Sequence, residues 1–218
     1  VKDTGRALSD RPLCGIFIGG AAKRMGGYPK GMLPIAGAAP GTVEPIVLGL
    51  RRLAESVDLD TVLVGKHAAY QHLGIPHLCD EPEGIGPMGG LRALLLAAKG
   101  REVIALACDM PFVSKPILER LLAVDLTDAE VAAVQTEPGA PLESFLARYR
   151  PTVRSHLDQA IASGEHSLQR VLRGLRVKTL LLSEEERRVA QDWDRWEEVP
   201  DSVKSLLDLD EARRPSRS

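Results

Sequence analysis

LCGIFIGGAAKRMGGYPKG, residues 13–31, is the stretch that decides the fold of this 218-residue chain. Its opening run, residues 13–18, is apolar and rich in branched side chains, which predicts a strand buried on both faces of a parallel sheet. Behind it, four glycines within nine residues leave backbone N–H groups unshielded, and Lys23, Arg24 and Lys30 share the loop. Exposed amides and fixed positive charges attract a polyphosphate. The stretch therefore predicts a phosphate-binding loop at the end of a buried strand.

The loop matches neither of the two common nucleotide-binding fingerprints. A P-loop would place Ser or Thr after the lysine, whereas Lys30 lies between Pro29 and Gly31. No G-x-G-x-x-G opens a helix after the strand either. An ordinary glycine-rich surface loop with solvated basic residues is therefore the alternative to a phosphate site.

The composition is that of a soluble globular protein, with 44% apolar and 27% charged residues. A chain of 218 residues can bury the core of a single domain. The formal net charge of -2 produces no general field that would hold nucleic acid or an anionic membrane. Any phosphate site must therefore be a local concentration of positive charge.

The cysteines and the hydropathy of the sequence indicate the cellular compartment. Cys14, Cys79 and Cys108 are widely spaced, and each lies at the edge of an apolar run, which indicates reduced thiols. No apolar stretch approaches the roughly 20 residues that a membrane-spanning helix needs, and the start of the chain is polar. We expect a cytoplasmic protein with neither a membrane nor nucleic acid as a partner.

Strands and helices alternate along the chain. After the first strand, the pattern predicts strands at 61–64, 75–79, 102–107, 131–135, 142–148 and 176–182, and helices at 43–53, 91–99, 114–124, 151–162 and 167–175. This alternation calls for a Rossmann-like three-layer α/β sandwich with a mostly parallel sheet. We expect a single domain at 13–210, with a nucleotide-binding half at 13–125 and an acceptor-binding half at 126–210. Residues 1–12 and 211–218 are expected to be a disordered lead and tail.

Asp109 is the best candidate for a metal ligand. It stands where the strongly apolar strand at 103–108 ends, and ligands of open α/β sheets lie beyond the carboxyl ends of the strands. An aspartate at this position could also serve only as a turn former.

Several of these residues resemble the motifs of the molybdenum cofactor guanylyltransferase family. Phe17-Ile18-Gly19-Gly20 is similar to that family's L-A-G-G motif. Arg24-Met25-Gly26 corresponds to its R-M-G motif, and Lys30-Gly31 corresponds to its K-G motif. Cys108-Asp109-Met110-Pro111 resembles its C-D-x-P motif. Gly86-Pro87-Met88-Gly89-Gly90, with Asp80 upstream, resembles its G-P-L-A-G motif.

The resemblance implies a fold of the nucleotide-diphospho-sugar transferase type and a GMP transfer from GTP to the terminal phosphate of molybdenum-molybdopterin. Lys30 and Arg24 would grip the triphosphate, and Asp109 would hold Mg²⁺, which prefers hard oxygen ligands. The remaining nucleotide contacts would come from the residues Phe17, Ile18, Gly19, Gly20, Asp80, Gly86 and Pro87. Guanine is favoured over cytosine, and transient contacts with molybdoenzyme maturation proteins are implied.

The second substrate is less well defined by these motifs. The family has an N-V-N-T-P-E-like segment near its C-terminus, and the equivalent expected here, at 196–201, lacks the asparagines. Glu197 and Glu198 would repel a phosphorylated pterin. A sugar phosphate or another small phosphorylated metabolite is therefore an alternative acceptor. A GTP-binding protein without turnover is the non-enzymatic alternative.

Overall fold

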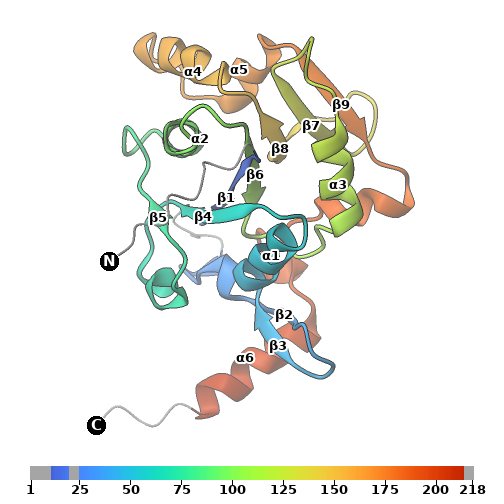
Figure 1. Ribbon diagram of the computed structural model, residues 1–218. Helices are drawn as coiled ribbons and strands as arrows, with labels where there is room; N and C mark the ends of the chain where they lie inside the picture. The colour runs from blue at the N-terminus through green and yellow to red at the C-terminus, as the bar shows by residue number, and fades with distance from the viewer. Residues whose placement is uncertain (1–10, 20–24, 214–218) are drawn as a thin grey trace, which may run out of the picture.

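The computed structural model describes residues 11–19 and 25–213, and its centre is a seven-stranded sheet (Figure 1). The strands are β1 (Leu13–Phe17), β4 (Asp60–Val64), β5 (His77–Leu78), β6 (Val103–Ala107), β7 (Val131–Gln135), β8 (Glu143–Tyr149) and β9 (Val177–Leu181). They lie in the order β5-β4-β1-β6-β8-β7-β9, and β8 runs antiparallel to both of its neighbours. The other pairings are parallel. The predicted α/β fold with a mostly parallel sheet is confirmed.

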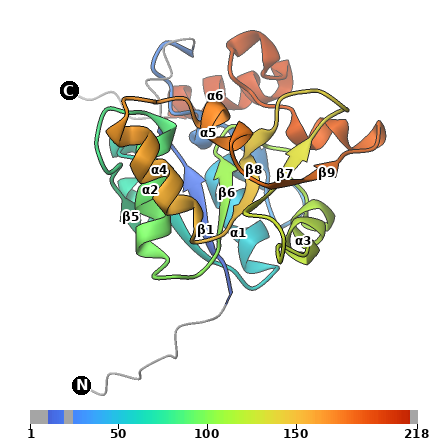
Figure 2. The same cartoon turned by 90° about the horizontal axis from the view of Figure 1, so that it is seen from above.

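Helices cover both faces of the sheet. The α-helices of the described residues are α1 (Ile46–Glu55), α2 (Pro87–Ala97), α3 (Lys115–Ala123), α4 (Val153–Ala162), α5 (Leu168–Arg173) and α6 (Asp201–Arg213). The short 3-10 helices are η2 (Lys30–Met32), η3 (Ala68–Leu73), η4 (Glu185–Ala190) and η5 (Trp196–Glu198). Helices α1 and α3 share one hydrophobic core, and α2, α4 and α5 share the other, with α2 and α4 side by side (Figure 2). None of the described helices is long and apolar enough to cross a membrane.

The two central strands explain where the site forms. The sequences LCGIF in β1 and VIALA in β6 are apolar throughout, and their first four residues are buried. The two strands pair in parallel with Phe17 opposite Ala107, so that they end side by side. The loops that follow them therefore begin at the same edge of the sheet, which is where ligands of such sheets bind.

Helix α2 begins earlier than the predicted helix at 91–99. Pro87 occupies its first turn, where the missing N–H costs nothing, and Gly86 precedes it with a φ of 67°. A Cβ atom at Gly89 would lie 2.4 Å from the Pro82 carbonyl oxygen, and one at Gly90 would lie 2.9 Å from the Phe17 ring. The glycines that were expected to form a loop instead let the helix approach the strand ends closely.

Other differences lie in the connections. Residues 43–45, expected as the start of a helix, form β3 (Val43–Pro45), which pairs with β2 (Pro34–Ala36) in a separate hairpin. The sequence pattern missed α6, which runs into the stretch expected as a tail. Of the expected lead and tail, residues 1–10 and 214–218 lie outside the described residues.

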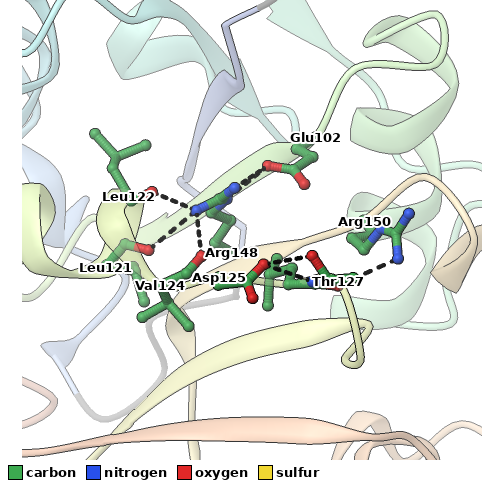
Figure 3. Close-up of polar contacts among 9 residues, drawn as sticks. Glu102, Leu121, Leu122, Val124, Asp125, Thr127, Arg148 and Arg150 are labelled. Carbon is green, nitrogen blue, oxygen red and sulfur yellow. Dashed lines mark hydrogen bonds and ion pairs between the residues drawn. The ribbon is translucent and has the colours of Figure 1, made fainter.

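Arg148 of β8 contacts both the end of α3 and Glu102, which precedes β6, at the end of the sheet where β6 begins (Figure 3). Its guanidinium donates to the carbonyl oxygens of Leu121 at 3.4 Å, Val124 at 3.1 Å and Leu122, so it caps the C-terminal end of α3. Its Nε also donates to the Glu102 carboxylate at 2.6 Å. The side chain is only 13% exposed, so these contacts are largely shielded from water.

Candidate active site

A cavity of about 650 Å³ opens at the carboxyl ends of the parallel strands. One part of its wall comes from the loops after β1, β4, β5 and β6, and includes Phe17, Ile18, Gly19, Lys30, Asp80, Gly86, Pro87 and Asp109. The other part comes from later in the chain, and includes Pro141, Leu142, Glu143, Ser144, Phe145, Gln169, Asp192 and Asp194. The two parts face one space that is large enough for two small ligands.

Lys30 lies between two carboxylates in this cavity. Its Nζ donates to Oδ2 of Asp109 at 2.9 Å and also to Oδ1 of Asp194. The three side chains are 15%, 19% and 29% exposed, so water screens the contacts only in part. Burial alone would lower the pKa of the Lys30 ammonium, but hydrogen bonds and charge from Asp194 and Asp109 outweigh it, and the pKa is raised. Lys30 therefore remains charged.

Glycine at position 31 allows Lys30 to reach this position. The Gly31 N–H donates to the hydroxyl oxygen of Tyr70 at 3.1 Å, and Tyr70 is itself buried. A Cβ atom at Gly31 would lie 3.0 Å from the Cβ atom of Cys108. A larger residue after the lysine would push the loop away from the end of β6.

The backbone brings the segment 192–194 to the end of β6. The Trp193 N–H donates to the Asp109 carbonyl oxygen at 2.9 Å, and the Trp193 ring is only 2% exposed. Asp192 and Asp194, on either side of this anchor, both line the cavity. The pKa of Asp192 is raised by burial and by the charges of Asp109, Glu198 and Asp194.

This arrangement corrects the expectation for the C-terminal segment. Neither Glu197 nor Glu198 is among the described residues that line the cavity. Glu198 instead accepts a hydrogen bond from the Arg195 N–H at 2.7 Å and caps η5. Two acidic residues that do line the cavity, Asp192 and Asp194, lie just before the segment at 196–201 where the equivalent was expected.

The loop that carries Asp80 is braced by Arg92 on α2. Arg92 contacts the Glu81 carboxylate at 3.3 Å and donates to Asp158 on α4 at 2.6 Å. Burial and the nearby charge of Glu83 raise the pKa of Asp80. Asp80 lies at the cavity wall beside the first turn of α2, whose positive dipole end favours an anion.

The structure brings most of the predicted site residues to one cavity. Eight of the ten lie in its wall, and the remaining two, Gly20 and Arg24, lie outside the described residues. The roles assigned to them stay predictions. Sequence reasoning missed Tyr70, Glu143, Gln169, Asp192 and Asp194, which also line the cavity. The acid-aromatic-acid pattern at 192–194 is the sequence feature that could have pointed to Asp192 and Asp194.

The donor set at Lys30 suits a hard divalent cation. Within the part of the chain that the structure describes, no three His, Cys, Asp or Glu side chains form a metal-binding group. Asp109 and Asp194, however, already direct carboxylate oxygens at one positive charge. Mg²⁺ commonly takes one or two carboxylates and completes its octahedron with phosphate oxygens and water. The residues present therefore fit such an ion when a polyphosphate is bound.

The chain is similar to known proteins over most of its length. Residues 14–180 match the family described as "MobA-like NTP transferase domain". A molybdenum cofactor guanylyltransferase of Pseudomonas putida is 34% identical over 185 residues, which cover 82% of this chain and 92% of that protein. One from Burkholderia orbicola is 29% identical over 84% of this chain and 91% of its own length.

Solved structures share the fold. Molybdopterin-guanine dinucleotide biosynthesis protein A from Archaeoglobus fulgidus has a TM-score of 0.64 at 19% identity, over 92% of this chain and 99% of that one. The 2-C-methyl-D-erythritol 4-phosphate cytidylyltransferase from Thermus thermophilus has a TM-score of 0.59 at 14% identity, over the same shares. The match over residues 14–180, together with the identity to the Pseudomonas putida protein, shows that this chain belongs to the MobA-like NTP transferase family.

Proposed function

We propose that this protein transfers GMP from GTP to the terminal phosphate of molybdenum-molybdopterin, releasing pyrophosphate and forming the guanine dinucleotide cofactor. Membership of a nucleotidyltransferase family and the names of the curated relatives support the reaction class. The observation that carries the proposal is the Lys30–Asp109–Asp194 cluster, which lies in a cavity walled by residues from both ends of the chain. Such a cavity can hold a nucleotide and an acceptor together.

The acceptor's phosphate is the nucleophile, and it is already anionic at neutral pH. No side chain has to remove a proton, so catalysis rests on holding two polyanions in line and neutralising their charge. Lys30 supplies a fixed positive charge, and the N-terminus of α2 adds the positive end of its helix dipole beside Asp80. Arg24 is proposed as a second cation for the triphosphate.

Asp109 and Asp194 are proposed to hold Mg²⁺. When bound there, the ion would neutralise negative charge on the reacting phosphates. Asp109 is fixed for this task because its own carbonyl oxygen accepts the Trp193 N–H. Lys30 keeps both carboxylates at the cavity in the absence of the ion.

We further propose that the two halves of the chain bind different substrates. Residues 13–125 would bind the nucleotide, with Phe17, Ile18, Gly19, Gly20, Gly86 and Pro87 around it. Residues 126–210 would provide the acceptor side. A cytoplasmic location and transient contacts with molybdoenzyme maturation proteins belong to the same proposal.

The test is a pyrophosphate-release assay with GTP and Mg²⁺. One arm contains molybdenum-molybdopterin, a second contains a sugar phosphate, and a third contains no acceptor. Pyrophosphate and the guanine dinucleotide are expected in the first arm alone. Release in the sugar phosphate arm would identify a different acceptor class, and GTP binding without release in any arm would contradict transfer.

A further inference from the structure

Glu143 is a carboxylate inside the cavity that the proposed chemistry leaves unused. It is the first residue of β8 and lines the cavity beside Phe145, whose ring lies 4.5 Å from that of Phe17. Among the described residues, no hydrogen bond or ion pair involves its side chain, although Lys30, Asp109 and Asp194 are paired nearby. A part-buried carboxylate without a donor costs free energy unless a ligand supplies one.

The backbone on both sides of Glu143 is held firmly. Gln169 donates from Nε2 to the Leu142 carbonyl oxygen at 2.8 Å, and the Tyr149 hydroxyl donates to the Ser144 carbonyl oxygen at 2.7 Å. The Tyr149 side chain is fully buried. Gln169 and Tyr149 thus hold the backbone before and after Glu143. The Glu143 carboxylate itself lines the cavity.

An irregularity in the sheet sets the direction of this segment. The pairing of β7 with β8 shifts register after Ala133, so that Val134 pairs with Glu143 although Ala133 pairs with Ala147. Bulges of this kind re-aim side chains near the edges of sheets and next to active sites. The chain therefore departs from a regular ladder at the point where Glu143 meets the cavity.

The local charge decides which ligand group can approach Glu143. Burial and the charge of Asp192 raise the pKa of the Glu143 carboxyl to about 6, so the group is mostly ionised at pH 7. Asp192, on the same side of the cavity, is a second acid. A phosphate would be repelled here, whereas N–H groups of a neutral heterocycle would be attracted. Carboxylates accept hydrogen bonds from exocyclic amines of this type.

We propose that Glu143 is a specificity-determining residue for the acceptor: its carboxylate accepts the ring amide N–H and the adjacent exocyclic amine of a pterin. The inference rests on the proposed function. By holding the ring at Glu143, the protein leaves the acceptor's phosphate to extend toward Lys30. The same pair of donors occurs on guanine, but Glu143 belongs to the part of the wall formed late in the chain, with Leu142, Gln169 and Asp192, whereas Asp80, Gly86 and Pro87 belong to the earlier part.

The main test compares Glu143→Gln with the wild type and with Glu119→Gln, a matched change on the exposed face of α3. Glu143→Gln is expected to raise KM for the acceptor roughly 10- to 100-fold, since it replaces two charge-assisted hydrogen bonds with at most one neutral bond. The Kd for GTP measured without acceptor should not change. Raised GTP Kd with unchanged acceptor KM would assign Glu143 to guanine and overturn the proposal.

A second test does not depend on turnover. Pterin carries the amide and the amine, whereas lumazine carries an oxygen in place of the amine. Wild-type protein should bind pterin more tightly than lumazine in a fluorescence titration, and Glu143→Gln should lose that preference. Equal binding of the two by wild-type protein would refute the inference even if molybdopterin releases pyrophosphate. Pterin preference without pyrophosphate release would refute only the proposed function.

A melting curve checks that Glu143→Gln is folded. Should the variant fail to fold, Glu143→Asp keeps the charge and shortens the side chain by one methylene group. It is expected to weaken pterin binding without affecting GTP binding. Unchanged pterin binding by a folded Glu143→Asp variant would then overturn the proposal.

Discussion

Replacing Lys30 with methionine tests the central cluster most directly. The change keeps an unbranched side chain that is one atom shorter and removes the charge that Asp109 and Asp194 share. Two carboxylate oxygens that contact one ammonium lie no more than about 5 to 6 Å apart. At about 5 Å and an effective dielectric constant of about 20, two like charges repel by roughly 3 kcal/mol. The variant should therefore lose both stability and activity.

The expected loss of stability is about 1 to 3 kcal/mol at pH 8, because partial exposure screens some of the repulsion. For a chain of this size, each kcal/mol lowers Tm by about 2 to 4 °C. Turnover should fall by a factor of about 100 to 1,000, as for other well-placed donors to a developing charge.

The assays are thermal melts at pH 8 and pyrophosphate release with GTP, Mg²⁺ and acceptor. Lys115→Met is the matched control, because its ion pair with Glu119 is exposed and spans 3.7 Å. We expect this control to change stability by less than about 1 kcal/mol and to leave turnover intact. Near-normal turnover by folded Lys30→Met, or a Tm equal to that of the wild-type protein, would refute the reasoning.

The other predictions concern the carboxylates, the base and the fold. Asp109→Asn and Asp194→Asn should each abolish most turnover with little change in Tm, and raised Mg²⁺ should restore only part of it; wild-type turnover at low Mg²⁺ would place the metal elsewhere. GTP should bind more tightly than CTP or ATP in a titration with Mg²⁺, and equal affinity for CTP would contradict the assignment of guanine. Arg148→Met should lower the free energy of unfolding by about 2 to 4 kcal/mol in urea titrations, because it leaves Glu102 and the end of α3 without their donor. A smaller loss than for Lys115→Met would show that this contact is not structural.

The sequence could predict features that depend on local patterns. The apolar runs of β1 and β6 reveal two buried strands, and Asp109 follows one of them directly, so its place at the ligand edge follows from parallel pairing. Pro87 was harder to place, because glycines after it usually indicate a loop. Here the glycines lie in helix α2, where Phe17 and the Pro82 carbonyl come so close that a side chain would not fit.

Features that depend on distant contacts were out of reach. Nothing near Lys30 in the sequence points to Asp194, its second partner, and the direction of β8 depends on which strand it joins rather than on its own residues. The β8 bulge that places Glu143 is likewise set by pairing with β7. Alternation of apolar and polar residues identifies a strand but carries no information about its neighbours.

The contact between Lys30 and Asp194 also bears on how the molecule is made. The two residues are 164 positions apart. Trp193, whose N–H contact with Asp109 holds Asp194 near the cluster, comes after every strand of the sheet in the sequence. During synthesis, a chain emerges from its N-terminus, and contacts between distant residues form only after both have appeared. A nascent chain can thus assemble the whole sheet while its cluster still lacks one carboxylate. The finished charge arrangement therefore forms only after Asp194 has been translated, later than all the strands of the sheet.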